Sequence, residues 1–226
     1  MAVWVLGNTK LAAITNGGFE TGDLTDWTVS IPSAWSAFGD LRPAGSAGVI
    51  GAWTLNDNGT PPGNRYPVAG ENFLSVGTSG NAFFTNAPSV TYDISVSQTQ
   101  SFQAGDLLSG YSFFYNGDYE EQDSAWVRIL DGDGNQVANP WFHASGPNPN
   151  INYRDSGPWT YWQWLAPADG VYTLDLGVST FGDNRFASYG FHDDITVMSS
   201  AVPEPAAGSL ILLGAGLVAL RRFRKK

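Results

Sequence analysis

Residues 89–96 read Ser89-Val90-Thr91-Tyr92-Asp93-Ile94-Ser95-Val96, and apolar and polar side chains alternate throughout. Successive side chains of an extended strand point to opposite faces, so a period of two marks a strand with one buried face. The stretch is therefore predicted to be a half-buried β-strand, with Val90, Tyr92, Ile94 and Val96 on the buried side.

Similar short runs, separated by turn residues, occupy most of the chain before residue 201, and helical periodicity is nearly absent before residue 206. Eight or nine strands in one chain predict an all-β fold, a jelly-roll β-sandwich. Two stretches rich in Pro, Gly and Asn, residues 31–69 and 139–158, are expected to be long loops. The other predicted strands are 26–30, 73–76, 107–115, 126–130, 136–138, 159–165, 170–178 and 191–198.

The formal charge of −10 hides a division along the chain. Residues after 201 hold five of the 11 basic residues and one of the 21 acidic residues, which leaves residues 1–201 with a net charge of −14. A body of this charge is repelled by nucleic acid and by anionic membrane surfaces. The chain has no cysteine, which excludes disulfides, thiolate metal sites and thiol catalysis.

The C-terminal segment has three parts. A Pro-Glu-Pro break is followed by an uncharged apolar run, residues 206–220, and then by a basic tail. As a helix, this run would be about 22 Å long, somewhat short of a hydrocarbon layer of about 30 Å. Basic residues stay on the cytoplasmic side of a membrane, so the body is expected to face outward.

This segment resembles the PEP-CTERM sorting signal of Gram-negative bacteria that make exopolysaccharide. The motif residues are Val202, Pro203, Glu204 and Pro205, and the basic tail comprises Arg221, Arg222, Arg224, Lys225 and Lys226. The resemblance implies export, transient anchoring in the inner membrane through residues 206–220, processing by an exosortase, and delivery to the cell surface or extracellular matrix. The alternative is an ordinary C-terminal membrane anchor, which also places the body outside the cytoplasm.

Three regions are therefore predicted. Residues 1–13 are interpreted as a remnant or misassigned leader, because the apolar stretch from Met1 to Gly7 is shorter than a signal peptide requires. Residues 14–199 form the β-sandwich, and residues 200–226 form the sorting segment with its linker, transmembrane helix and basic tail.

Two segments near the ends of the body, residues 16–27 and 189–197, read NGGFETGDLTDW and YGFHDDITV. Together they resemble the galactose-binding-like jelly roll of many carbohydrate-binding modules. The resemblance implies that the two segments lie side by side and hold a structural calcium ion, with Glu20 and Asp194 as side-chain ligands and backbone carbonyls around Gly18 and Asp194 as further ligands. The alternative is that Glu20 caps a turn and Asp194 hydrogen-bonds a backbone amide.

Sugar-binding sites combine a flat aromatic ring with nearby amide and carboxylate groups. Trp35, Trp53 and Trp141 lie in or beside predicted loops and are the candidate platforms for an extracellular polysaccharide. The alternative is that such large rings cover the ends of the sandwich.

Support for catalysis is weak, because no Gly-x-Ser-x-Gly elbow occurs and the two histidines are far apart in the sequence. An exported, non-enzymatic β-sandwich associated with exopolysaccharide is the favoured interpretation. A lectin-like carbohydrate-binding module is the first alternative, and a glycoside hydrolase, which would need two facing carboxylates, is the second.

Overall fold

The computed structural model describes residues 12–35, 41–54, 64–78, 91–117, 123–145, 155–181 and 186–200. All regular structure in these ranges is β, which confirms the predicted fold class. The strands are β1 (Thr28–Ser30), β2 (Ser33–Trp35), β3 (Leu41–Pro43), β4 (Gly45–Ile50), β5 (Trp53–Thr54), β6 (Asn64–Arg65), β7 (Phe73–Thr78), β8 (Thr91–Phe102), β9 (Leu107–Asn116), β10 (Ser124–Leu130), β11 (Gln136–Ala144), β12 (Asp155–Ser156), β13 (Thr160–Leu165), β14 (Gly170–Phe181) and β15 (Tyr189–Met198).

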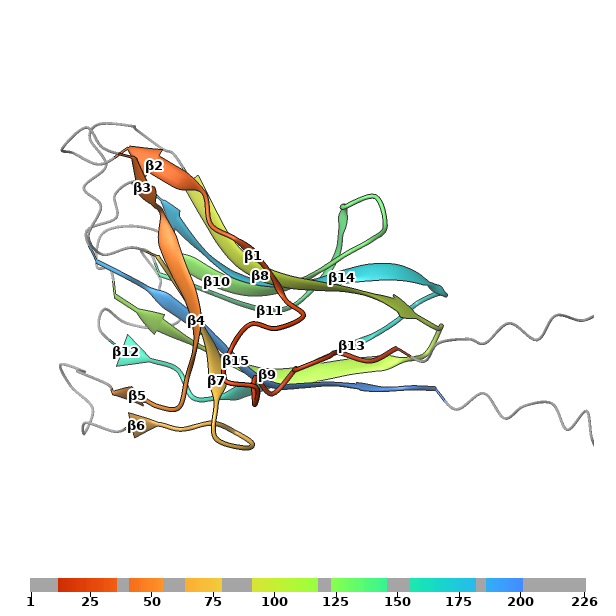
Figure 1. Ribbon diagram of the computed structural model, residues 1–226. Helices are drawn as coiled ribbons and strands as arrows, with labels where there is room; N and C mark the ends of the chain where they lie inside the picture. The colour runs from red at the N-terminus through yellow and green to blue at the C-terminus, as the bar shows by residue number, and fades with distance from the viewer. Residues whose placement is uncertain are drawn as a thin grey trace, which may run out of the picture.

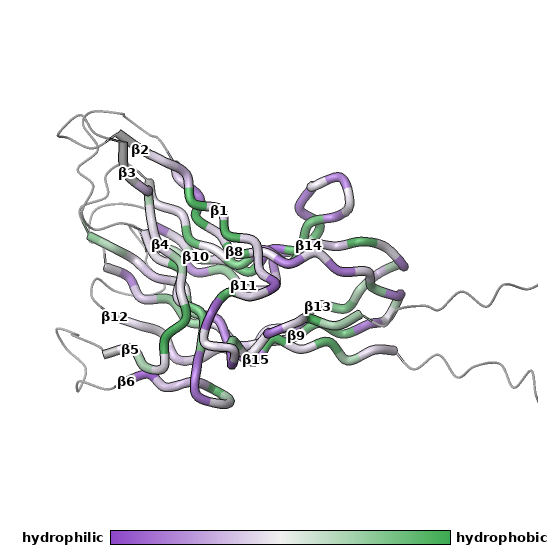
Figure 2. Tube along the Cα trace, in the orientation of Figure 1, coloured by the Kyte–Doolittle hydropathy of each residue, from purple (hydrophilic) through white to green (hydrophobic). Residues whose placement is uncertain are grey.

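Two antiparallel sheets pack face to face (Figure 1). The five-stranded sheet has the order β1-β8-β14-β10-β11, and the six-stranded sheet contains β12-β9-β15-β7-β4 with β13 also paired to β9. Two further pairs, β2-β3 and β5-β6, stand apart from these sheets. Hydrophobic residues concentrate along the strands, and hydrophilic residues concentrate at the turns (Figure 2).

The strand predicted over residues 89–96 is β8, which extends to Phe102. Ile94 and Val96 are fully buried, and Tyr92 packs against the core, as the alternation predicts. Val90 lies outside the described residues.

The prediction of long loops over 31–69 and 139–158 was wrong in part. The first stretch contains β4, which reads GSAGVI and shows no apolar–polar alternation, but pairs along β7. A Cβ on Gly45 would lie 2.4 Å from the Gly77 carbonyl oxygen, so this close approach needs glycine. The second stretch contains the rest of β11, which tolerates Pro140 because β11 is an edge strand.

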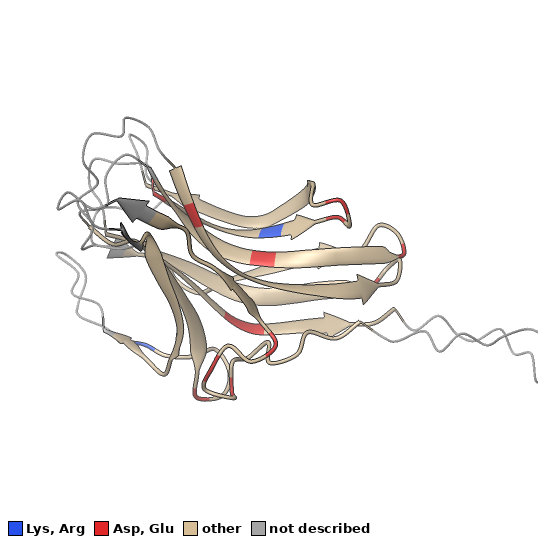
Figure 3. Ribbon diagram, turned by 45° about the horizontal axis from the view of Figure 1, so that its top comes forward, with Lys and Arg blue, Asp and Glu red and all other residues tan. Residues whose placement is uncertain are grey.

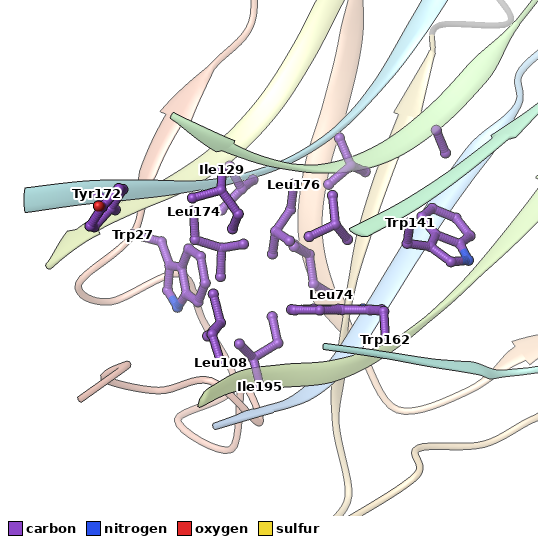
Figure 4. Close-up of a cluster of buried hydrophobic side chains, with 14 of the residues drawn as sticks. Trp27, Leu74, Leu108, Ile129, Trp141, Trp162, Tyr172, Leu174, Leu176 and Ile195 are labelled. Carbon is purple, nitrogen blue, oxygen red and sulfur yellow. The ribbon is translucent and has the colours of Figure 1, made fainter. Parts of the chain in front are cut away.

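The main core fills the space between the two sheets (Figure 4). Leu74, Leu108 and Ile195 come from the six-stranded sheet, and Leu174 and Leu176 face them from β14. All five side chains are at most 2% exposed. Burial of this apolar surface is the main force that holds the two sheets together.

A second cluster lies on the opposite side of the six-stranded sheet, and we call it the outer aromatic cluster. Phe73, Phe113 and Phe191 form its buried centre. They are on the outer face because their chain neighbours Leu74 and Phe114 belong to the main core. Further side chains that pack on this centre are Ile50, Trp53, Tyr115, Trp159 and Tyr189.

Candidate functional site

The opening segment and the last strand of the body lie side by side, as the resemblance implied. The backbone N–H of Ile195 donates a hydrogen bond to the Gly17 carbonyl (3.0 Å). A Cβ on Gly17 would lie 2.0 Å from the Ile195 carbonyl oxygen, so only glycine fits this contact. The pairing of β15 with β9 is irregular between Asp193 and Thr196, and Asp194 has a left-handed backbone (φ 50°).

Glu20 caps a turn beside this junction. One carboxylate oxygen accepts a hydrogen bond from the Asn72 backbone N–H (3.0 Å), and both oxygens lie within 3.1 Å of the Glu71 nitrogen. This is the role that the alternative to metal binding gave to Glu20. The described ranges contain no group of three or more His, Cys, Asp or Glu side chains placed to hold a metal. A calcium site built from Glu20, Asp194 and carbonyls near Gly18 stays a prediction.

Asp193 is the more deeply buried carboxylate of this junction, and sequence reasoning did not select it. One oxygen accepts hydrogen bonds from the backbone N–H groups of Val68 (2.6 Å) and Ala69 (3.2 Å), and the other accepts from Asp194 N–H (2.7 Å). Burial raises the pKa of Asp193 to about 6, although these three donors favour its charged form. Acidic residues gather around this junction (Figure 3).

Together, these two carboxylates tie down residues 64–72, which we call the covering loop. Asp193 holds its middle and Glu20 holds its end. The indole N–H of Trp159 donates to the Tyr66 carbonyl (2.9 Å), which attaches the loop to the outer aromatic cluster. The junction thus fixes a loop over the six-stranded sheet.

Two of the three candidate sugar platforms, Trp53 and Trp141, pack in hydrophobic clusters of the body. Trp141 is only 5% exposed and belongs to the main core, so the prediction of an open ring there was wrong. Trp53 is partly buried in the outer aromatic cluster, with its ring 4.7 Å from Tyr189 and 5.0 Å from Phe191. The side chain of Trp35 lies outside the described residues. Covering a sheet removes more apolar surface from water than an open loop position would.

Other aromatic rings are exposed in their place. Tyr161 is 50% exposed, and its ring centroid lies 5.3 Å from that of Tyr111 on the neighbouring strand β9. Along the same outer face, the next row across the sheet is polar and consists of Gln163, Ser109 and Thr196. No pattern in the sequence separates these tyrosines from buried ones, because exposure depends on which distant segments cover that part of the face.

A serine and a histidine meet inside the sandwich. Ser112 Oγ lies 2.8 Å from His192 Nδ1, and the Trp162 indole N–H donates to Ser112 Oγ (2.9 Å). Ser112 and His192 are both 0% exposed, and burial lowers the pKa of His192 to about 3. A substrate cannot reach this pair, so its arrangement is that of a neutral, internal hydrogen-bonded group.

Comparison with protein families gives one match: residues 201–225 match the PEP-CTERM protein-sorting motif. The four motif residues, the predicted helix over 206–220 and the basic tail all lie outside the residues that the structure describes. Across the described ranges, no helix is long and apolar enough to cross a membrane. A search of curated proteins gave no match.

Among solved structures, the carbohydrate-binding module TmCBM61, in complex with β-1,4-galactotriose, is 16% identical and covers 83% of this chain and 97% of its own, with a TM-score of 0.42. The K1 cleaved adhesin domain of Lys-gingipain from Porphyromonas gingivalis W83 is 15% identical and covers 84% and 98%, with a TM-score of 0.43. Tailspike protein 4 of bacteriophage CBA120 is 11% identical, with a TM-score of 0.43; the match covers 83% of this chain but only 21% of the tailspike chain.

Proposed function

We propose that this chain is an exported, non-enzymatic surface protein whose β-sandwich is delivered by its C-terminal sorting segment and associates with exopolysaccharide outside the cell. The observation that carries the proposal is the match of residues 201–225 to a protein-sorting motif, immediately after the last described residue of the sandwich, Ser200. The net charge of −14 before the sorting segment agrees with a body that has no nucleic-acid partner.

The test is to co-express the full chain with an exosortase-type enzyme and to weigh the surface form by mass spectrometry. The surface form is expected to end near residue 205, without the basic tail. A chain with Pro203→Ala and Glu204→Ala is expected to keep the tail and to stay in the membrane fraction. Pro167→Ala, at an exposed turn of the body, is the matched control and is expected to be processed normally. A surface form that still carries Arg221 to Lys226 refutes processing.

Carbohydrate binding is the second candidate function, and the exposed Tyr161 beside Tyr111 favours it. An aromatic ring can pack on the apolar face of a pyranose, while the polar row formed by Gln163, Ser109 and Thr196 offers hydrogen bonds to its hydroxyl groups. The expected result is retardation of the chain in gels that contain the native exopolysaccharide. Tyr161→Ala should abolish the retardation, and Phe142→Ala, a ring 48% exposed on β11, should not. Equal loss in both variants, or no retardation at all, contradicts this site.

We further propose that a structural calcium ion is held by Glu20, Asp194 and backbone carbonyls near Gly18. The contact between Gly17 and Ile195 supports it by bringing the two segments together, and the Glu20 carboxylate keeps lone pairs beyond those that cap the turn. Saturating calcium at 100 times its Kd would add about 2.7 kcal/mol to the free energy of unfolding.

The corresponding measurement is the melting temperature with and without a chelator. The chelator should lower the melting temperature of the unmodified chain and leave that of Glu20→Gln unchanged. Asp131→Asn is the control, because Asp131 binds only backbone and side-chain groups of its own hairpin turn, so its chelator response should persist. If the chelator does not change the melting temperature of the unmodified chain, the calcium proposal is refuted.

A further inference from the structure

The sandwich holds the chain firmly up to the point where the sorting segment begins. The backbone N–H of Ser200 donates to Asp106 Oδ1 (2.8 Å), and its hydroxyl donates to the Ala104 carbonyl (3.1 Å). Asp106 is itself buried, and its second oxygen accepts from the Gln103 N–H (2.8 Å). The turn between β8 and β9 therefore fixes the exit of the sorting segment at Ser200.

A second turn completes this end of the molecule, which we call the exit end (Figure 1). The Gly105 N–H donates to the Ala166 carbonyl (2.8 Å), and the Ala104 N–H donates to the Asp169 carboxylate (2.7 Å). The two turns read QAGD and APAD, so they contain no Lys or Arg. Asp169 is their exposed carboxylate, because Asp106 is buried.

An apolar row crosses the six-stranded sheet at the exit end. Leu107 on β9 is paired with Leu165 on one side and with Met198 on the other. Their neighbours Leu108 and Val197 pack in the main core, so the row points outward. Leu165 is 60% exposed and Met198 is 71% exposed. We call Leu107, Leu165 and Met198 the exit row.

The distance from the exit row to a membrane is limited by covalent geometry. Five residues, 201–205, separate Ser200 from the apolar run that starts at Ala206. At no more than about 3.6 Å per residue, Ser200 lies within roughly 22 Å of Ala206. The headgroup layer takes up about 6 Å of that distance.

Electrostatics selects the end of the sandwich that can approach a lipid surface. The body carries a net charge of −14 and is repelled by anionic headgroups. At the exit end the tether is five residues long, the two turns expose one carboxylate (Asp169), and Leu165 and Met198 of the exit row are exposed. Transfer of apolar side chains from water to the boundary between headgroups and acyl chains lowers their free energy.

We propose that the exit row is a membrane-contact surface: while the sorting segment is inserted, Leu107, Leu165 and Met198 lie against the lipid headgroups and the sandwich stands on its exit end. This inference rests on the proposed function, because it requires residues 206–220 to anchor the chain.

The test uses single cysteines, since the natural chain contains none. Met198→Cys and Leu165→Cys carry a nitroxide label at the exit row. Val137→Cys, 48% exposed on β11 of the other sheet, is the matched control. Each full-length chain is reconstituted in vesicles of phosphatidylethanolamine and phosphatidylglycerol. Collision of the label with lipid-soluble oxygen is then compared with collision with a water-soluble nickel complex.

The oxygen-to-nickel collision ratio should be several-fold higher at positions 198 and 165 than at position 137. This difference should disappear when the chain is cut after Ser200. Flotation of the vesicles separates the two possible failures. A full-length chain that does not float overturns both the anchoring and this inference. A chain that floats while all three labels have the same ratio overturns the membrane contact alone and leaves the proposed function standing.

Discussion

The outer faces of the two sheets differ in what covers them: one is packed with aromatic rings and the other carries a polar network. On the six-stranded sheet, Phe73, Phe113 and Phe191 are buried beneath further rings and the covering loop. On the five-stranded sheet, Trp126 is fully buried outside the main core, and polar groups surround it. The first face is thus a second hydrophobic core, whereas the second is an ionic network around one ring.

The outer face of the five-stranded sheet is stabilised by interactions of charged side chains around Trp126. The Trp126 indole N–H donates to Asp175 (3.0 Å), and the Arg128 guanidinium carbon lies 3.7 Å from the centre of the ring. Arg128 also forms a salt bridge with Asp93 (3.2 Å), which accepts a hydrogen bond from Ser179. Burial of apolar area depends little on salt, whereas exposed ion pairs are screened by it. The two faces should therefore differ in their response to mutation, pH and salt.

The largest difference is expected from removing a ring. Phe113 stacks on Phe191 at 4.3 Å and meets the Trp159 ring edge at 4.6 Å. Phe113→Ala leaves a cavity and should lower the free energy of unfolding by about 3–5 kcal/mol in urea denaturation. Phe142→Ala, on the five-stranded sheet and 48% exposed, should cost less than about 1 kcal/mol. Similar losses in both variants would show that the outer aromatic cluster is not a core.

The inner side of β15 should make the protein sensitive to acid. Burial holds the pKa of His192 at about 3, below its ordinary value of 6.5. The unfolded chain binds this proton first, so stability is present above pH 6.5 and is lost as the pH falls toward 3. Between pH 6.5 and pH 4 the loss should be about 3 kcal/mol. His192→Asn should be less stable at neutral pH but should lose little more on acidification, as urea titrations at several pH values can check.

The outer side of the same strand should act in the opposite sense. The folded pKa of Asp193 is raised to about 6 by burial, so its contribution to stability is full below pH 4 and is lost as the pH rises through 6. The expected amplitude is about 3 kcal/mol. Asp193→Asn removes this opposing term, so acidification should destabilise it more steeply than the natural chain. If the two pH profiles are parallel, Asp193 does not titrate as described.

The smallest effect is expected on the polar face. Arg128→Ala removes a partly exposed ion pair and a cation–π contact, each worth less than about 1 kcal/mol at such sites. The total loss should be about 1 kcal/mol and should shrink in high salt. Phe113→Ala is the reference, because its cost should not fall with salt. A salt-independent loss in Arg128→Ala would assign the contribution of Arg128 to packing of its aliphatic stem instead.

The opening and closing segments of the body were paired correctly from the sequence, since Gly17 and Ile195 are hydrogen-bonded. The two strands predicted over 126–130 and 136–138 are also found, and they are joined by a turn in which the Asp131 carboxylate accepts the N–H groups of Asp133 and Asn135. The prediction of an exposed ring at Trp141 was wrong, because Trp141 is in the main core. A tryptophan beside a predicted loop gives no sign of which distant segment will cover it.

By itself, the sequence determined the all-β class, through the period-two alternation of strands such as β8, and the sorting motif at 201–225. Both are local, because each depends on neighbouring residues in one stretch of chain. Only the tertiary structure decided which rings remain exposed, which carboxylate is buried and where the sorting segment leaves the body. Asp193 binds Val68 across 125 residues of chain, and Ser200 binds Asp106 across 94. Contacts at such separations arise from the packing of whole sheets, so the alternation along one strand cannot predict them.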